Sequence, residues 1–390
     1  MSTPIIVCAG GGTGGHVFPL VAVADALRQA APDLRVVFVG TERGIEKRVV
    51  PERGYELELL QVLPLRGNGL KAAVRGVGYA ALALPRAMSV LRRRRPLAVL
   101  SIGGYAAGPV ALAARALGIP LSMIEPNADI GLSNRLVAPL VSRAYTAFPE
   151  AQRFFRSRVV LETGVPIRTG FAPAPYQRAG SVLRVLVLGG SQGSRILNEV
   201  VPRALARLPG AVRVVHQCGA TKEEGPRRLY AELGLADQVQ VEPFLDDVPA
   251  ALVEAELVIG RAGASTVAEI CAVGRPSLLL PYPFAGDHQR FNAQSLERRG
   301  AARCVRATDA TPERLASELA LLLSEPGRLP EMAERARMLG RPRAAELIAE
   351  DVLDLAGLMG GAQRAFQDSG MPNASHGGGR PAMSSQGEAL

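Results

Sequence analysis

Three glycine-rich loops in this sequence each follow a short apolar run. They read GGGTGG at residues 10–15, GGY at residues 103–105 and GGSQGS at residues 189–194. Glycine lets the backbone approach a ligand closely, and the free N–H groups at the start of a helix favour an anion. A single loop of this kind also fits a tight turn without a ligand, but three in one chain favour a bound phosphate or diphosphate. No Lys-Ser or Lys-Thr pair follows the first loop, which excludes a P-loop nucleotide hydrolase.

His16 and Ser191 supply reactive side chains beside these loops. His16 directly follows the first loop and is one of only 4 histidines. An imidazole with an ordinary pKa of about 6.5 suits a general base near neutral pH. A capping role is the plain alternative for His16. Ser191 lies inside the third loop, where its hydroxyl and the surrounding amides can hold a diphosphate.

The segment RAGASTVAE at residues 261–269 is the most specific pattern. It follows the apolar run 257–259 and opens a helix, so its small residues bring backbone N–H groups close to a ligand. Glu269 falls in the first turns of that helix, where its carboxylate can accept hydrogen bonds from both hydroxyls of a ribose. A glutamate that merely complements the helix dipole is the alternative. Further along the chain, DHQR at residues 287–290 and Asn292 offer polar groups suited to sugar hydroxyls.

Continuous apolar runs must position these loops. In the first half the runs occupy residues 5–9, 35–40, 97–102 and 121–124, and in the second half residues 183–188, 212–216, 239–241, 257–259 and 277–280. Runs without alternation are typical of buried parallel strands, and helical segments separate them. The chain is therefore predicted to be α/β, with two Rossmann-like doubly wound domains facing across a cleft. Ligands of such sheets lie outside the carboxyl ends of the strands.

Four segments follow from this organisation. Residues 1–166 are predicted to form the first domain and residues 167–340 the second, with a linker rich in Gly and Pro from residue 170. A helix at residues 341–358 can return to the first domain. The tail at residues 359–390 is poor in apolar residues and is predicted to be disordered.

The net charge of +9 comes from one segment. Residues 59–124 contain no acidic residue and nine basic ones, and the remaining Lys and Arg balance the 36 Asp and Glu. Aromatic residues are sparse there, which argues against a nucleic-acid partner. Basic and apolar residues alternate instead, which favours an anionic membrane surface, although a core-facing helix with a solvated basic face fits as well. The expected apolar strip comprises Leu65, Leu70, Val74, Val77, Tyr79, Leu82 and Leu84, flanked by Arg66, Lys71, Arg75 and Arg86.

Other patterns exclude several classes of protein. The 4 cysteines lack CxxC spacing, so neither a disulfide framework nor a zinc ribbon is expected. No two aspartates are spaced as DxD, and no metal is expected at the site. The uncharged stretches 5–24 and 96–114 are interrupted by glycine clusters, so no transmembrane helix is predicted. The first residues lack a basic region, and no signal peptide is expected.

Eight motifs occur in order between residues 4 and 355. They read GGGTGGHVFPL, IGGYAAGP, EPN, GLSN, TGVPIRT, LGGSQGS, RAGASTVAE and DHQxxNA. Together they resemble the MurG family of bacterial glycosyltransferases. The resemblance implies a GT-B fold and transfer of N-acetylglucosamine, with inversion, from a UDP-GlcNAc donor to the 4-hydroxyl of a polyprenyl-linked muramyl pentapeptide in peptidoglycan synthesis. It implies no cofactor, and a peripheral location on the cytoplasmic face of the inner membrane.

The resemblance also implies roles for individual residues. His16 and Glu125 are the two candidates for the base, and the sequence does not choose between them. The family usually has His-Glu-Gln-Asn where this chain has Ile124-Glu125-Pro126-Asn127, so no role of that His is transferred. The implied donor-binding residues are Thr13, Gly14, Gly15 and Asn127 at the sugar side, Arg168 and Ser191 at the diphosphate, Leu245 at uracil, Gly263, Ala264, Ser265, Thr266, Val267 and Ala268 along the nucleotide, Glu269 at the ribose, and His288 and Gln289 at the sugar.

Three other functions fit parts of this pattern. An NAD-dependent oxidoreductase would use the first glycine loop and an acidic residue such as Glu42, but it leaves RAGASTVAE and the loop at 189–194 without a role. A UDP-GlcNAc 2-epimerase of the same fold needs no lipid acceptor and does not explain the basic segment. A non-catalytic peripheral membrane protein explains that segment but not the loops.

Overall fold

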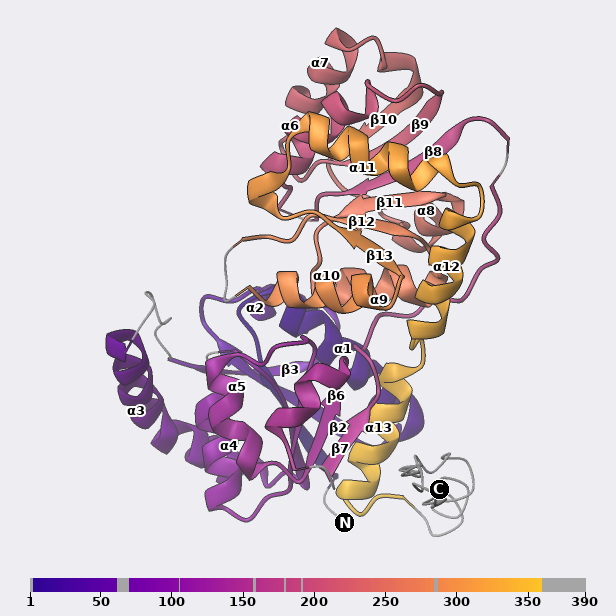
Figure 1. Ribbon diagram of the computed structural model, residues 1–390. Coiled ribbons are helices and arrows are strands. Elements are labelled where there is room, and N and C mark those ends of the chain that lie inside the picture. Colours follow the sequence, from indigo (N-terminus) through magenta and orange to yellow (C-terminus); the bar gives the residue numbers. More distant parts are fainter. Residues whose placement is uncertain are drawn as a thin grey trace, which may run out of the picture.

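Two α/β domains stack end to end in the molecule (Figure 1). The computed structural model describes residues 3–61, 70–104, 106–156, 159–178, 180–190, 192–283 and 287–359. For residues 70–81 it describes the backbone but not the side chains. Within this part of the chain the N-terminal sheet has the strand order β3-β2-β1-β4-β5-β6-β7 and the C-terminal sheet β10-β9-β8-β11-β12-β13. Every strand pair is parallel.

The N-terminal domain alternates strands and helices around its sheet. Its strands are β1 (Ile5–Gly10), β2 (Arg35–Thr41), β3 (Glu56–Leu60), β4 (Ala98–Gly103), β5 (Leu121–Glu125), β6 (Arg143–Thr146) and β7 (Val160–Glu162). Its helices are α1 (Gly14–Ala30), α2 (Glu46–Glu52), α3 (Leu70–Arg94), α4 (Ala107–Ala116) and α5 (Leu132–Val137). Val, Ile, Leu and Ala from both faces of the sheet build two buried clusters, as continuous apolar strands require.

The C-terminal domain repeats this plan. Its strands are β8 (Leu183–Leu188), β9 (Val212–Gln217), β10 (Val239–Glu242), β11 (Leu257–Gly260), β12 (Ser277–Leu279) and β13 (Ala302–Cys304). Its helices are α6 (Arg195–Leu205), α7 (Glu224–Glu232), α8 (Val248–Glu254), α9 (Ala264–Val273), α10 (His288–Arg298), α11 (Pro312–Ser324) and α12 (Arg328–Leu339). The prediction of two Rossmann-like domains is confirmed.

The last helix, α13 (Ala344–Leu355), lies beside the N-terminal domain although it follows the second one (Figure 1). Ile348 and Val352 are buried in the cluster that includes residues of α1. Asp351 accepts a hydrogen bond from the Tyr145 hydroxyl at 2.7 Å and pairs with Arg143 at 3.4 Å. The chain therefore crosses between the domains twice, after β7 and again between α12 and α13. The predicted tail lies, from residue 360 onward, outside the described residues.

The strand order reverses direction beside the first strand of each sheet. In the N-terminal sheet this switch point lies between β1 and β4, and in the C-terminal sheet between β8 and β11. The glycine loops at residues 10–15 and 189–194 and the RAGAST segment all follow these strands at their carboxyl ends. Ligands of doubly wound sheets bind at such points, because the loops on either side diverge and leave a crevice.

Candidate active site

The imidazole of His16 is held by the backbone of the first glycine loop. His16 lies in the first turn of α1, and its Nδ1 is 3.3 Å from the carbonyl oxygen of Gly11. A carbonyl can only accept, so this contact assigns the proton to Nδ1 and leaves the Nε2 lone pair unprotonated. Burial lowers the pKa of His16 below its ordinary value, and the Gly11 contact acts in the opposite direction. The arrangement suits a base that is neutral at physiological pH.

Glu125 sits at the end of β5 and is 1% exposed. Its Oε1 accepts hydrogen bonds from the backbone N–H of Asn127 at 3.0 Å and from the Asn127 side chain at 3.3 Å. Its Oε2 accepts one from the Asn134 side chain at 2.9 Å. Burial raises the pKa of Glu125 to about 7, although the bonds from Asn134 and Asn127 lower it. The carboxylate thus organises the two asparagines, and both of its oxygens already have donors.

Helix α9 provides the candidate nucleotide site in the second domain. Gly263 is its N-cap, and residues 264–273 form the helix that follows β11. The Ser265 hydroxyl is buried and has no hydrogen-bond partner among the described residues. Burial raises the pKa of Glu269, in the second turn, to about 7, and the positive charge of Arg168 lowers it. The charge of Arg168 therefore acts on the Glu269 carboxyl.

The other candidate donor-site residues differ in how far they are buried. Val267 is 2% exposed and belongs to the core of the second domain, so only its backbone can face a nucleotide. Leu245 is half-buried against the same core. Thr13 is the N-cap residue of α1, and its side chain makes no capping bond. Ser191 lies outside the described residues.

Several hydrogen bonds bring the two halves of the site together. His288, the first residue of α10, places Nδ1 2.9 Å from the carbonyl oxygen of Asp129. The Asn292 side chain donates to Asn127 Oδ1 at 3.2 Å and to the Ala262 carbonyl at 3.2 Å. Its own Oδ1 accepts from the backbone N–H of Ala128 at 2.8 Å. Asn292 therefore links the Glu125–Asn127 segment to the loop before α9.

A second set of contacts closes the interface beside this network. Glu150 accepts hydrogen bonds from the Ser295 hydroxyl at 2.9 Å and from Arg298 at 2.7 Å, and it pairs with Arg299 at 3.4 Å. Gln289, by contrast, stays within its own domain, where its side-chain oxygen accepts from the Tyr282 N–H at 2.9 Å. Neither Glu150 nor Asn134 was predicted as a site residue: Asn134 belongs to the GLSN motif but was given no role, and nothing in the sequence around Glu150 marks it.

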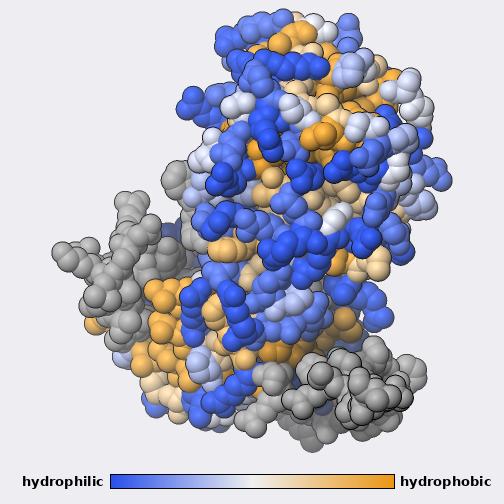
Figure 2. All heavy atoms as spheres, in the orientation of Figure 1, coloured by the Kyte–Doolittle hydropathy of each residue, from blue (hydrophilic) through white to orange (hydrophobic). Residues whose placement is uncertain are grey.

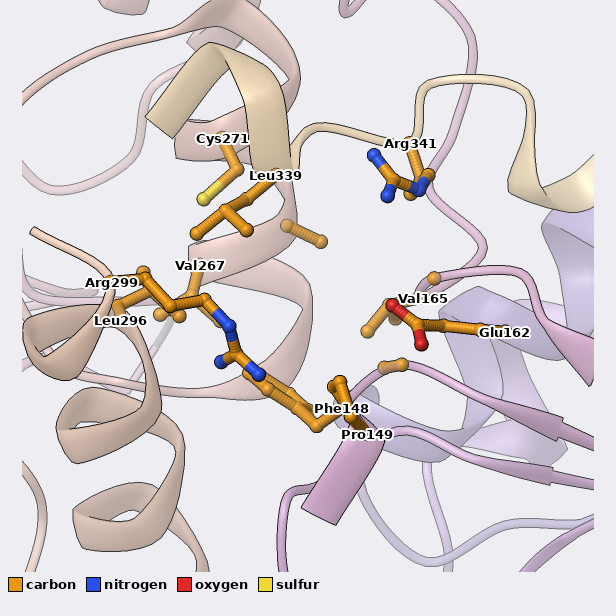
Figure 3. A pocket seen from close by; sticks show the side chains of 13 residues that line it. Phe148, Pro149, Glu162, Val165, Val267, Cys271, Leu296, Arg299, Leu339 and Arg341 are labelled. Atoms are coloured by element: carbon orange, nitrogen blue, oxygen red, sulfur yellow. The ribbon is translucent and has the colours of Figure 1, made fainter. Parts of the chain in front are cut away.

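A small pocket of about 60 Å³ lies at the two crossovers between the domains (Figure 3). Phe148, Val165 and Leu296 are part of its apolar lining, and the side chains of Arg299 and Glu162 extend into it. Val267 and Ala268 border it, but His16, Glu125 and Glu269 do not. This pocket therefore lies at the crossovers and does not include these three candidate site residues.

Among the described residues, no group of three or more His, Cys, Asp or Glu side chains is arranged to hold a metal ion. Three of the cysteines, Cys8, Cys218 and Cys271, are buried and unpaired, and Cys304 is half-buried. No helix of the described segments is both long and apolar enough to cross a bilayer.

Comparison with known proteins decides the family. The glycosyltransferase family 28 N-terminal domain matches residues 6–146, and the glycosyltransferase family 28 C-terminal domain matches residues 184–348. The chain belongs to glycosyltransferase family 28. Both family 28 domains coincide with the two Rossmann-like units, so the glycine loops and the RAGAST segment lie within the matched regions.

Individual relatives narrow the assignment within family 28. The chain is 56% identical over 357 residues to the UDP-N-acetylglucosamine--N-acetylmuramyl-(pentapeptide) pyrophosphoryl-undecaprenol N-acetylglucosamine transferase of Sorangium cellulosum, covering 90% of this chain and 88% of that protein. The crystal structure of Acinetobacter baumannii MurG superimposes with a TM-score of 0.76 at 32% identity, covering 90% of this chain and 99% of that one. The predicted resemblance to the MurG family is confirmed.

The same fold occurs in the epimerase that the sequence left as an alternative. The UDP-GlcNAc 2-epimerase of Neisseria meningitidis superimposes with a TM-score of 0.62, covering 90% of this chain and all of that one, but the identity is 14%. Such a likeness shows the shared GT-B fold and nothing about the reaction. The family 28 relatives support the transferase, so the epimerase and the oxidoreductase alternatives are not retained.

Proposed function

We propose that this protein transfers N-acetylglucosamine from UDP-GlcNAc to the muramyl 4-hydroxyl of a pentapeptide carried on pyrophosphoryl-undecaprenol. The observation that supports this most is the 56% identity, over 90% of the chain, to a transferase named for that reaction. In the proposed site, His16 and Asn127 of the N-terminal domain and Glu269 of the C-terminal domain act on one donor molecule. We also propose that the donor is held by the binding residues that the family resemblance implies, from Thr13 to Gln289. This set includes Ser191, which lies outside the described residues.

The reaction needs a base and a site for the leaving group. In the proposed mechanism Nε2 of His16 takes the proton of the muramyl hydroxyl, and the oxygen attacks the anomeric carbon from the face opposite UDP. The bond to UDP breaks with its electron pair, and inversion results. Arg168, the amides of the loop at 189–194 and the N-terminus of α9 stabilise the charge that develops on the diphosphate.

His16 is the better candidate for the base on geometric grounds. Its Nε2 is left as an acceptor by the contact of Nδ1 with Gly11. Both oxygens of Glu125 already accept hydrogen bonds from Asn127 and Asn134, and the group is 1% exposed. A proton arriving at Glu125 would displace one of these donors. We assign Glu125 the role of orienting Asn127 at the donor sugar.

A product assay tests the reaction class directly. The protein is incubated with UDP-GlcNAc, with and without a short-chain polyprenyl muramyl pentapeptide, and UDP release and sugar nucleotides are measured. We expect UDP to appear only with the acceptor, in equal amount to the disaccharide product. Formation of UDP-ManNAc without acceptor would instead identify an epimerase. Absence of both products with a folded, UDP-binding protein would refute the proposed function.

We further propose that the protein is peripheral on the cytoplasmic face of the membrane and docks through the N-terminal domain. Figure 2 shows hydrophobic surface over the part of that domain where α4 and α5 lie. Leu132 and Leu136 of α5 are 57% and 61% exposed, and Leu112 of α4 and Leu82 of α3 are exposed too. Apolar side chains of this kind can enter the interface of a bilayer.

In α3, the described residues agree only in part with the apolar strip expected from the sequence. Leu84 packs against the domain core and is not free to enter a membrane. At the end of α3, Arg93 and Arg94 pair with Glu58 at 2.9 and 2.6 Å, and Arg94 also pairs with Glu56 at 2.9 Å, so these two charges are compensated in part. Arg86 is exposed. Leu65 and Arg66, and the side chains of Leu70, Lys71, Val74, Arg75, Val77 and Tyr79, lie outside the described residues.

Changing Leu132 and Leu136 together to Glu is expected to reduce co-sedimentation with anionic vesicles at least about tenfold. Each buried leucine contributes about 1.5–3 kcal/mol when it leaves water, and an added carboxylate is repelled by anionic lipid. Vesicle sedimentation at two salt concentrations measures the effect. The charge reversal of Lys71, Arg75 and Arg86 to Glu is expected to act in the same direction, and more strongly at low salt.

Leu321→Glu is the matched control for the membrane test. Leu321 is 53% exposed, but it lies on α11 of the other domain. This variant should sediment like the wild type, and all variants should keep their affinity for UDP-GlcNAc. Unchanged sedimentation of the Leu132/Leu136 double variant would place the membrane-facing surface elsewhere.

A further inference from the structure

Glu46 is a buried carboxylate that the mechanism above leaves without a role. It is the first residue of α2, follows the turn after β2, and is 1% exposed. Glutamate is almost never fully buried unless its charge is compensated. Neither its position after a strand nor its neighbours Gly44 and Ile45 marked it in the sequence. The role of Glu46 must therefore be inferred from the groups that donate hydrogen bonds to its carboxylate.

Both oxygens of Glu46 accept hydrogen bonds from donors at the active-site end of the sheet. Oε1 accepts from the backbone N–H of Thr41 at 2.8 Å and from the Thr41 hydroxyl at 2.9 Å. Oε2 accepts from the backbone N–H of Gly12 at 2.8 Å. The side chain thus ties the end of β2 to the first glycine loop. Charged acceptors make stronger hydrogen bonds than neutral ones, so this tie is firm.

Three glycines leave the room that the carboxylate occupies. A Cβ atom on Gly11 would lie 2.2 Å from Oε1, and one on Gly44 would lie 1.9 Å from Oε2. A Cβ atom on Gly40 would lie 2.5 Å from Cγ of Glu46. Real Cβ atoms do not approach so closely, so any larger residue would displace the carboxylate. Glycines from the end of β2, the following turn and the first loop are thus needed to seat this one side chain.

The Gly11–Gly12 peptide connects Glu46 to His16. The N–H of Gly12, which donates to Glu46, and the carbonyl of Gly11, which faces Nδ1 of His16, belong to one peptide group. A trans peptide is planar, and its N–H and C=O point in opposite directions. Fixing the N–H at Glu46 therefore fixes the direction of the carbonyl that holds the imidazole. A charged acceptor also polarises the peptide and strengthens its carbonyl as an acceptor.

The close packing around this peptide allows little adjustment. A Cβ atom on Gly104, in the neighbouring loop, would lie 2.6 Å from the Gly11 oxygen and 3.4 Å from Nδ1 of His16.

Two titratable side chains act on the pKa of His16: Glu46 from α2 raises it, and His288 from α10 lowers it. Loss of the Glu46 charge would leave the opposing effect of His288.

We propose that Glu46 is a positioning residue of the transfer reaction: through the Gly11–Gly12 peptide its carboxylate orients the imidazole of His16 and strengthens it as a proton acceptor. This inference rests on the proposed function of His16 as the base. When the muramyl hydroxyl gives its proton to Nε2, Nδ1–H keeps its bond to Gly11, and the negative charge of Glu46 stabilises the imidazolium. The muramyl oxygen forms the new bond to the anomeric carbon, and the electron pair of the broken bond leaves with UDP.

Glu46→Gln is the variant that tests the proposal. The amide has the same shape, but it carries no charge, and its NH₂ group meets the N–H of Gly12, so two donors face each other. We expect kcat to fall about tenfold or more, while the KM for UDP-GlcNAc changes less than about twofold. The acid limb of kcat should move to lower pH, because removal of the negative charge makes His16 easier to deprotonate. A loss of kcat with an unmoved limb would reduce Glu46 to a structural residue and overturn the proposal.

Glu52→Gln is the matched control, since Glu52 is exposed at the end of the same helix. It should behave like the wild type in kcat and in pH profile. Glu46→Asp keeps the charge on a shorter side chain and should lower kcat while leaving the acid limb closer to that of the wild type. Affinity for UDP, which the other domain binds, reports on folding in each variant. A wild-type kcat and pH profile for Glu46→Gln would refute the inference.

NMR of the imidazole separates this inference from the proposed function. In the wild-type protein, ¹⁵N shifts should show neutral His16 as the Nδ1–H tautomer, and Glu46→Gln should lower the pH at which the ring titrates. These results do not depend on turnover, so they support the link between Glu46 and His16 even if the product assay fails. An Nε2–H tautomer in the wild type would overturn the inference even if the product assay succeeds and Glu46→Gln does not fold.

Discussion

Replacing His16 with alanine is expected to lower turnover about a hundredfold or more, because a positioned general base contributes about 10²–10⁴ to the rate. Donor affinity should stay within about twofold, since the proposed nucleotide site lies in the other domain. Turnover is measured with saturating acceptor, and UDP-GlcNAc affinity is measured separately by calorimetry. A large loss of donor binding with near-normal turnover would make His16 a positioning residue and return the base role to Glu125.

The pH dependence of the wild-type enzyme provides an independent test of the same assignment. A base works in its deprotonated form, so kcat rises as the pH increases through its pKa. Burial lowers the pKa of His16 below its ordinary value of 6.5, whereas burial raises that of Glu125 to about 7. A midpoint of the acid limb below 6.5 therefore supports His16, and a midpoint near 7 supports Glu125. His16→Ala should abolish that limb.

Much of the architecture could be predicted because its strands are buried on both faces. Runs such as residues 121–124 and 257–259 coincide with β5 and β11 to within one residue, and both strands are buried throughout. Burial on both faces demands uninterrupted apolar residues, and glycine loops mark the carboxyl ends. The four strands that were missed, β3, β6, β7 and β13, are each at most five residues long and contain a charged residue, so none forms a continuous apolar run.

The candidate donor-site residues have sequence patterns that the residues supporting them lack. His16, Glu125 and Glu269 belong to motifs in which small residues, glycines and a polar group follow a strand. Glu46 and Glu150 do not, because their significance depends on partners distant in sequence. Glu46 contacts Gly12, and Glu150 contacts Ser295 and Arg298 on the other domain. A single sequence does not reveal which glutamate will be buried by such partners, and here only the folded chain shows it.

The basic segment shows how a charge count can mislead. Residues 59–124 have no acid, yet Arg93 and Arg94 pair with Glu58, which lies just before the segment in the neighbouring strand. Likewise Leu84 was expected in the apolar strip but packs on the core. The exposed leucines of α5 were not part of that strip, because a short helix with two apolar residues has no distinctive pattern. The three-dimensional arrangement therefore shifts the membrane proposal toward α4 and α5.

Replacing Glu269 with alanine is expected to weaken UDP-GlcNAc binding by about 1.5–3 kcal/mol, which is about 10- to 150-fold in Kd. In the proposed site the carboxylate accepts hydrogen bonds from both ribose hydroxyls, so the loss should fall on donor affinity rather than on the chemical step. Calorimetric titration with UDP-GlcNAc measures it. Glu254→Ala, at the exposed end of α8, is the matched control and should bind like the wild type.

A 2′-deoxyuridine donor shows whether Glu269 acts through the ribose. The wild type should strongly prefer the ribose donor. Glu269→Ala should discriminate far less between the two donors, because it lacks the carboxylate that accepts a hydrogen bond from the 2′-hydroxyl. The pH supplies a second test, since burial raises the pKa of Glu269 to about 7 and Arg168 lowers it. The ionised carboxylate accepts both hydroxyls and the protonated acid accepts them poorly, so wild-type affinity should rise as pH increases through about 7, and Glu269→Ala should lack this rise. If the alanine variant keeps the full preference for ribose, the ribose site lies elsewhere, and Glu269 serves only the dipole of α9.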